Sequence, residues 1–309
     1  MKKIKYLLSA IPAAMFATGA QADISVSGSG SVAYTDAGGN TSTTMGGGVS
    51  FAMSTTTDGG VTISGSAGTS NDDDSVGSSS GATGITNLTF AFANGSISVG
   101  QDVGVADGVG KVGELAHYND SQTGITNSTG LGDDEGDGIS ASTSIGDMTL
   151  GVAYVYDGAA NGNVDGATTT SQSVSLSMPV GDGTITVASA SDDLGGTNMN
   201  EVGAKYVMAA AGGTLSLGFT GTDGDTASKE GESMSVAFST TLGGASVGIG
   251  YTGHDVNSTT AQRTDITISS ALGGGASIFA EYSNVSGTVA TENATLSNNV
   301  LAVGTSVSF

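Results

Sequence analysis

The chain of 309 residues contains no cysteine, no tryptophan and only two prolines. Without cysteine, neither a disulfide framework nor a Cys-ligated metal can stabilise it. Basic residues are also scarce, since 7 Lys and Arg stand against 29 Asp and Glu, a formal net charge of −22. This balance argues against nucleic acid as a partner, because phosphate binding needs clustered Lys and Arg. It favours a path or a surface for cations.

Long apolar segments are missing as well. After residue 22 no run reaches the about 20 apolar residues that a membrane-spanning helix needs. Residues 1–22 have the form of a cleaved signal peptide, in which three lysines precede an apolar stretch and the small-x-small sequence at 20–22 marks the cleavage site. We therefore expect a mature chain of one domain, residues 23–309. Loss of three of the 7 bases leaves four against 29 acids, a net charge of −25.

The 52 glycines and the abundant serine and threonine provide little material for a soluble core. This composition suits either a disordered exported chain or a structure whose interior is water. Periodicity favours the second, because apolar and polar residues alternate over stretches of about ten residues, the signature of a membrane barrel. In residues 147–156, the even positions are Met148, Leu150, Val152, Tyr154 and Tyr156.

About sixteen such segments occur, and closed bacterial barrels require an even number. Short turns alternate with longer polar loops between them, and the longest loop spans 103–136. We predict an all-β, antiparallel transmembrane β-barrel with short periplasmic turns and long extracellular loops. The predicted strands are 24–34, 43–55, 60–70, 85–93, 95–102, 137–145, 147–156, 170–179, 183–192, 198–209, 213–222, 231–241, 244–253, 263–272, 276–283 and 299–309.

Charged residues inside these segments provide a test of the barrel. Each of them has the parity opposite to that of the apolar residues and therefore faces water. A barrel requires this, because a cation on the lipid side near the middle of the membrane costs about 2–4 kcal/mol. Most aromatic residues sort toward the two membrane interfaces, although Tyr206, Phe219 and Phe279 do not. The charged residues predicted to line the lumen are Glu201, Lys205, Arg263, Asp265 and Glu281.

The two ends of the mature chain are motif-like, with DISVSG at 23–28 and VGTSVSF at 303–309. Together with the signal peptide and the single long loop after the fifth strand, they resemble the trimeric general porins of Gram-negative outer membranes, especially the acidic alphaproteobacterial kind. The resemblance implies a homotrimer in the outer-membrane lipid bilayer that passes small hydrophilic solutes. It also implies that Phe309 is part of the signal read by the outer-membrane assembly machinery.

The resemblance further implies that the loop at 103–136 folds into the lumen and forms the constriction. The chain departs from the family in two ways. Its loop lacks the Pro-Glu-Phe-Gly-Gly-like segment of enterobacterial porins, and its wall lacks the usual Arg cluster, since Lys205 and Arg263 are nearly all it offers. Both departures weaken the expectation of a transverse field. The acids of the loop, candidate solute contacts, are Asp107, Glu114, Asp120, Asp133, Asp134 and Glu135.

No catalytic set is found, so we expect neither enzyme activity nor a resident cofactor. His117 and His254 lie in predicted loops without the spacing of metal ligands. Acidic clusters offer oxygen ligands that suit Ca²⁺, although none matches a twelve-residue EF-hand loop and solvated acidic loops are the simpler interpretation. The weak metal candidates are Asp72, Asp73, Asp74, Asp223 and Asp225.

The sequence thus predicts a passive diffusion pore whose width and negative lumen field select small hydrophilic solutes and cations. The alternative from another class is a secreted Gly/Ser-rich β-solenoid or adhesin-like surface protein stabilised by Ca²⁺. That structure needs a fixed repeat of about 20 residues or a nonapeptide motif, and the chain has neither.

Overall fold

The computed structural model describes residues 23–37, 39–71, 84–101, 103–106, 108–116, 137–157, 169–194, 198–225, 230–256, 259–289, 294–295 and 298–309. Across these residues the regular structure consists of β-strands. No helix among them is long and apolar enough to cross a membrane.

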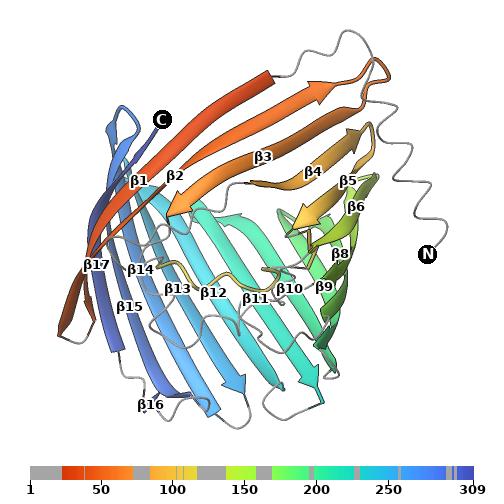
Figure 1. Ribbon diagram of the computed structural model, residues 1–309. Coiled ribbons are helices and arrows are strands. Elements are labelled where there is room, and N and C mark those ends of the chain that lie inside the picture. The colour runs from red at the N-terminus through yellow and green to blue at the C-terminus, as the bar shows by residue number, and fades with distance from the viewer. Residues whose placement is uncertain are drawn as a thin grey trace.

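Within the described residues seventeen strands follow one another, and the 16 longer ones form the wall of a closed antiparallel barrel (Figure 1). They are β1 (Asp23–Ala37), β2 (Asn40–Thr56), β3 (Thr62–Asn71), β4 (Gly84–Phe92), β5 (Gly95–Gln101), β6 (Asp137–Ile145), β7 (Met148–Asp157), β8 (Thr169–Val180), β9 (Gly183–Leu194), β10 (Asn198–Ala210), β11 (Gly213–Gly224), β12 (Gly231–Leu242), β13 (Ala245–Val256), β14 (Thr259–Gly273), β15 (Ala276–Val289) and β17 (Asn298–Ser308). The two-residue β16 (Ala294–Thr295) pairs with the end of β15.

The ring closes where the first strand meets the last. β1 pairs with β17 from Ser29 opposite Ser308 to Ala37 opposite Val300, and β17 pairs on its other side with β15. All sixteen predicted strands are present, so the prediction of an antiparallel barrel is confirmed. The solenoid alternative is not supported, because a β-solenoid stacks parallel strands, whereas the pairings described here are antiparallel.

Several strand ends differ from the prediction. β14 begins at Thr259 rather than near 263, and β15 continues to Val289 rather than 283. Apolar alternation stops before these ends, but the ladder does not, because backbone pairing needs no apolar side chain. Backbone pairing likewise extends β13 beyond its predicted end, so His254, which was predicted to lie in a loop, lies within this strand.

The two ends of the barrel carry different connections. At the end we call the short-turn end, tight hairpins join the strands; Gly243 and Gly244, with φ of 60° and 88°, link β12 to β13 because two such residues form a type I′ turn. The opposite end, the loop end, carries the longer connections. Two connections there are shorter than the predicted strand ends imply, since Ala37 pairs with Asn40 and the last residue of β13 pairs with the first of β14.

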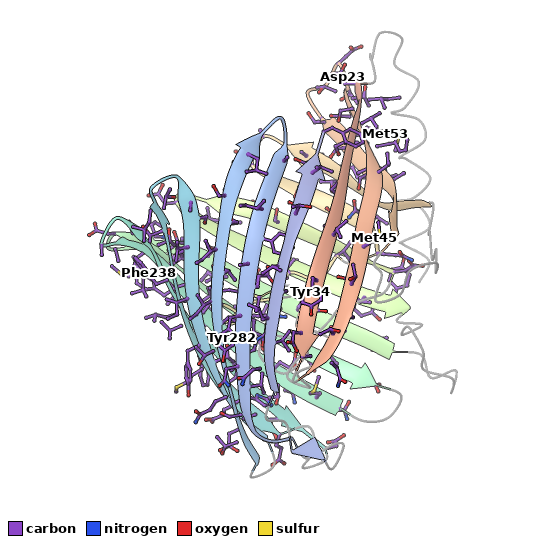
Figure 2. All side chains as sticks on the ribbon, turned by 90° about the vertical axis from the view of Figure 1, so that its left-hand side faces the viewer. Asp23, Tyr34, Met45, Met53, Phe238 and Tyr282 are labelled. Carbon is purple, nitrogen blue, oxygen red and sulfur yellow. The ribbon has the colours of Figure 1, made fainter. Side chains whose placement is uncertain are left out.

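Alternation along each strand separates a lipid-facing surface from a lumen-facing one. On β7, Val152 and Tyr154 are exposed outward, while Ala153 and Val155 between and beyond them are buried inside. Side chains of this outer surface stand away from the ribbon in Figure 2, where Tyr34 and Tyr282 are labelled. The parity expected of the acidic strand residues agrees with the structure, because an exposed apolar or aromatic residue directly follows each of them: Val202 after Glu201, Ile266 after Asp265 and Tyr282 after Glu281.

On the lumen side, hydroxyl groups of neighbouring strands hydrogen-bond across the ladder. Thr220 and Ser233 lie 2.6 Å apart, and Ser277 and Ser306 lie 2.7 Å apart, oxygen to oxygen. Paired hydroxyls satisfy one another, which lets a polar face stand at a water-filled interior without charged groups. Cross-strand hydroxyl pairs thus form part of the predicted polar lining of Ser and Thr.

The chain's last residue completes the seam between β1 and β17. The Phe309 amide donates to the Gly28 carbonyl and the Gly28 amide donates to the Phe309 carbonyl, both at 3.0 Å. The Phe309 ring lies over Gly28, where a Cβ atom would meet three ring carbons. Gly28 thus leaves room for the terminal aromatic ring at the short-turn end.

Adjacent residues of β14 provide a test of the two faces. Ile268 is exposed to lipid, while Thr267 faces the lumen opposite Glu281. Ile268→Arg should lower the free energy of unfolding by about 2–4 kcal/mol if it lies near the midplane, because the guanidinium enters hydrocarbon. Thr267→Arg, the matched control, should leave it nearly unchanged. Urea unfolding in lipid vesicles measures both, and equal losses would contradict the register of β14.

Candidate functional site

The segment that follows β5 enters the barrel and lies against the inside of the wall (Figure 1). Its described parts are residues 103–106 and 108–116. The apolar side chains of this segment are buried against the wall, and Ala106 and Val109 pack with Ala188 and Ala190 on the lumen face of β9. The buried apolar residues of the segment are Val103, Ala106, Val109, Val112 and Ala116.

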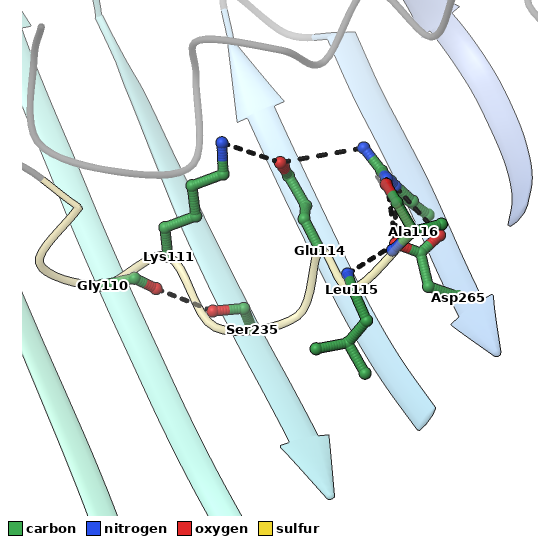
Figure 3. A network of polar contacts seen from close by, with 8 residues as sticks. Gly110, Lys111, Glu114, Leu115, Ala116, Ser235 and Asp265 are labelled. Carbon is green, nitrogen blue, oxygen red and sulfur yellow. Dashed lines mark hydrogen bonds and ion pairs between the residues drawn. The ribbon is translucent and has the colours of Figure 1, made fainter. Parts of the chain in front are cut away.

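Serine hydroxyls of the wall hold the first two-thirds of the segment. The Val105 amide donates to Ser173 Oγ of β8 at 3.3 Å, and Ser235 Oγ of β12 donates to the Gly110 carbonyl at 2.8 Å. Figure 3 shows the second contact, with the segment crossing in front of the strands. Because these bonds reach the backbone, they fix the path of the segment whatever side chains it carries.

An ion pair on β14 holds the far end of the segment. Asp265 Oδ2 accepts hydrogen bonds from the amides of Leu115 at 2.8 Å and Ala116 at 3.0 Å. Arg263 donates through Nε to Asp265 at 3.0 Å and through an Nη to the Ala116 carbonyl at 2.9 Å. Both side chains are fully buried, at 0% exposure, so the pair is enclosed between the wall and the segment.

Glu114 lies between two basic groups. Its carboxylate is 3.2 Å from Lys111 Nζ and 3.7 Å from an Nη of Arg263 (Figure 3). The Glu114 side chain is 2% exposed, whereas Lys111 is 36% exposed and reaches toward the lumen water. We name Lys111, Glu114, Arg263 and Asp265 the anchor cluster. It carries two charges of each sign, so the positive charge of Arg263 is compensated where it lies.

The structure thus brings three of the sequence-predicted site residues, Glu114, Arg263 and Asp265, into one cluster. They were predicted to contact solutes; in the structure Arg263 and Asp265 contact the inserted segment, and Glu114 belongs to that segment and contacts Arg263. Glu201 and Lys205 lie on the lumen face of β10, apart from the cluster in the strand order, whereas Glu281 lies on the lumen face of β15, which pairs with β14. Asp107, Asp120, Asp133, Asp134 and Glu135 lie outside the described residues, as do His117, Asp72, Asp73 and Asp74.

The remaining metal candidates lie at the loop end of β11. Asp223 is exposed on the outer face, and Asp225 Oδ2 accepts from the amide of Asn198 at 2.8 Å. Within the described ranges, no group of three or more His, Cys, Asp or Glu side chains is arranged to hold a metal ion.

Sequence reasoning missed Lys111, Ser173 and Ser235 as members of the site. The serines carry no distinguishing signal, because serine occupies many lumen-facing positions of the wall. Lys111 is one of the four bases left in residues 23–309 and was not singled out. Its three-residue spacing from Glu114 in a glycine-rich segment was the available signal for the ion pair.

Comparison with known proteins agrees with this architecture. A family model described as Gram-negative porin matches residues 9–305. No curated protein matches the chain. Solved structures with a similar fold include an anion-selective porin from Comamonas acidovorans, with 16% identity, a TM-score of 0.71 and coverage of 94% of this chain and 100% of that one.

Two further structures share the fold. One is the in-vitro folded, trimeric form of OmpT, an outer membrane protein of Vibrio cholerae, with 13% identity, a TM-score of 0.69 and coverage of 93% and 99%. The other is a mutant of Rh. blastica porin, with 19% identity, a TM-score of 0.63 and coverage of 93% and 100%. At these identities the likeness concerns the fold.

The anchor cluster predicts how the inserted segment responds to loss of its main acceptor. Asp265→Ala removes the partner of two segment amides and of Arg263, so the Leu115 and Ala116 amides should exchange hydrogen faster. Unfolding free energy should fall by about 3 kcal/mol, the low end for a broken buried pair, since Glu114 and the Ala116 carbonyl still contact Arg263. Asp223→Ala, on the outer face, is the control. Equal exchange in the two variants would contradict the anchor.

Proposed function

The chain belongs to the Gram-negative porin family and is a porin channel of the bacterial outer membrane. On that premise we propose that it passes small hydrophilic solutes by passive diffusion, with a preference for cations and without catalysis. A barrel of about sixteen strands leaves an aqueous channel rather than a packed interior. Solutes cross it down their concentration gradient, selected by the width and the field of the pore.

The observation that carries the cation preference is the burial of Arg263. A wall arginine that faced the pore would attract anions, but Arg263 is enclosed by the segment and paired with Asp265 and Glu114. The described bases inside the barrel are then Lys111, bound to Glu114, and Lys205 on β10. Because the chain carries a net charge of −22, these two bases leave the interior of the barrel negatively charged. The low-dielectric wall concentrates the electric field of that charge into the channel.

The fold itself does not decide the sign of selectivity. The Comamonas porin is described as anion-selective although its fold is similar, with a TM-score of 0.71. Its 16% identity leaves the lumen charges free to differ. We therefore base the proposal for this chain on its own charges.

Assembly forms a further part of the proposal. We propose a homotrimer, a state in which the Vibrio cholerae protein has been solved. We also propose that the assembly machinery recognises the exposed Phe309 ring, which is 78% exposed at the short-turn end. The signal peptide of residues 1–22 and Ca²⁺ binding by the acidic loops remain expectations from the sequence.

The cation preference predicts the sign of a reversal potential. In a planar bilayer with a KCl gradient, the wild-type protein should give a potential of the sign that K⁺ permeation produces. The preference should weaken in concentrated salt, because the screening length shortens to about 3 Å at 1 M.

Glu281→Lys should reduce this potential, because it reverses a charge on the lumen face of β15. Asp223→Lys makes the same change of charge on the exposed outer face of β11 and is the matched control. An anion-selective wild type would refute the electrostatic proposal, and equal shifts in the two variants would show that the lumen position has no special effect.

The role proposed for Phe309 predicts an assembly defect. Phe309→Ala keeps the two backbone bonds to Gly28 but removes the ring. We expect less folded protein in outer-membrane fractions, measured by heat-modifiable gel mobility, while purified protein still refolds in detergent. Normal amounts in the membrane would refute recognition of the ring.

A further inference from the structure

Glycines of the wall lie directly beneath the inserted segment. A Cβ atom on Gly218 of β11 would overlap the Gly110 carbonyl oxygen, and one on Gly250 of β13 would overlap the Gly113 carbonyl oxygen. At these two positions the segment's backbone rests on the backbone of the wall. Glycine is the residue that permits such an approach, because any side chain would occupy the same space.

Two further wall glycines lie under side chains of the segment. A Cβ on Gly138 of β6 would stand 2.7 Å from Val103 Cγ2 and 2.7 Å from the Tyr154 carbonyl oxygen of the neighbouring strand. A Cβ on Gly151 of β7 would stand 3.1 Å from Val105 Cβ and 2.8 Å from Ser175 Oγ of β8. These separations are shorter than ordinary van der Waals contact. The four glycines therefore mark the path of the segment from β6 to β13.

The contact is reciprocal. A Cβ on Gly110 would stand 2.5 Å from the Phe219 carbonyl oxygen, and one on Gly113 would overlap the Tyr251 carbonyl oxygen. Gly110 also has a φ of 98°, which only glycine adopts without strain. Absent side chains on both partners thus let the two backbones meet.

Glycines of the same strands that face outward lack this crowding. A Cβ on Gly221 of β11 would have its nearest neighbours at 3.6 Å, and one on Gly253 of β13 at 3.5 Å, both ordinary contact distances. Strand propensity does not explain the difference, because each pair shares a strand. The close fit belongs to the lumen face where the segment lies.

We propose that Gly138, Gly151, Gly218 and Gly250 determine the width of the pore by letting the inserted segment lie flat against the wall. The inference rests on the proposed function, since it names residues that set the size limit of the same channel. A side chain at any of these positions pushes the segment off the wall and toward the channel axis. The glycines carry no charge, so they control solute size and leave the sign of selectivity to other residues.

The test compares glycine-to-alanine changes on opposite faces of one strand. Gly218→Ala and Gly250→Ala should each lower single-channel conductance and the size of sugars admitted in liposome swelling, relative to Gly221→Ala and Gly253→Ala. Reversal potentials should stay at the wild-type value. Conductance equal to or above that of the matched control would overturn the proposal. A wild type without channel activity would instead refute the proposed function.

A milder variant serves if the first two fail to assemble. A Cβ on Gly248 of β13 would stand 3.0 Å from Leu115 Cδ1 and 2.7 Å from Thr267 Oγ1, both ends of side chains that can move. Gly248→Ala should lower the conductance, and adding Leu115→Ala should restore it. A double variant that stays as low as the single one would show that the effect does not act through the inserted segment, and would overturn the proposal.

Discussion

The structure depends on one constraint, that no backbone N–H or C=O group can be left unpaired in hydrocarbon. A sheet satisfies it only by closing on itself, which the pairing of β1 with β17 achieves. Closure gives every strand one face toward lipid and one toward water, so charged groups within the strands are confined to the inside. Arg263 and Asp265 face the inside of the barrel because of this confinement. Their full burial needs in addition a second layer of chain, the inserted segment, over the inner face of the wall.

The strands could be predicted from the sequence because a period of two residues is a local property. Residues 147–156 show it without knowledge of any neighbour, and the parity of Arg263 follows from that of Ile266, three residues further along the same strand. The partner of Arg263 could not be predicted in this way. The Ala116 carbonyl lies 147 residues away in a segment without periodicity, so no spacing relates the two. That the segment enters the lumen came from the family resemblance.

Besides its apolar packing on β9, three kinds of contact hold the inserted segment, and they differ in what they need from the sequence. The anchor cluster needs charges of both signs. The contacts made by Ser173 and Ser235 need only a hydroxyl group at a strand position that faces the segment's backbone. The remaining contact needs side chains to be absent. In a soluble core, empty space is filled to gain apolar contact. At Gly218 and Gly250 the wall and the segment forgo that contact, and the space saved becomes part of the channel.

The seam between β1 and β17 also bears on how the barrel forms. It joins Ser29 to Ser308, residues from opposite ends of the chain, whereas most other pairings are hairpins between consecutive strands. Contacts of large sequence separation form late, because closing a long loop lowers the chain entropy before these contacts contribute any stabilisation. Until that step, the folding sheet has two open edges that pair readily with other chains. The stage before the seam closes is therefore the part of biogenesis during which the nascent barrel is most exposed to aggregation.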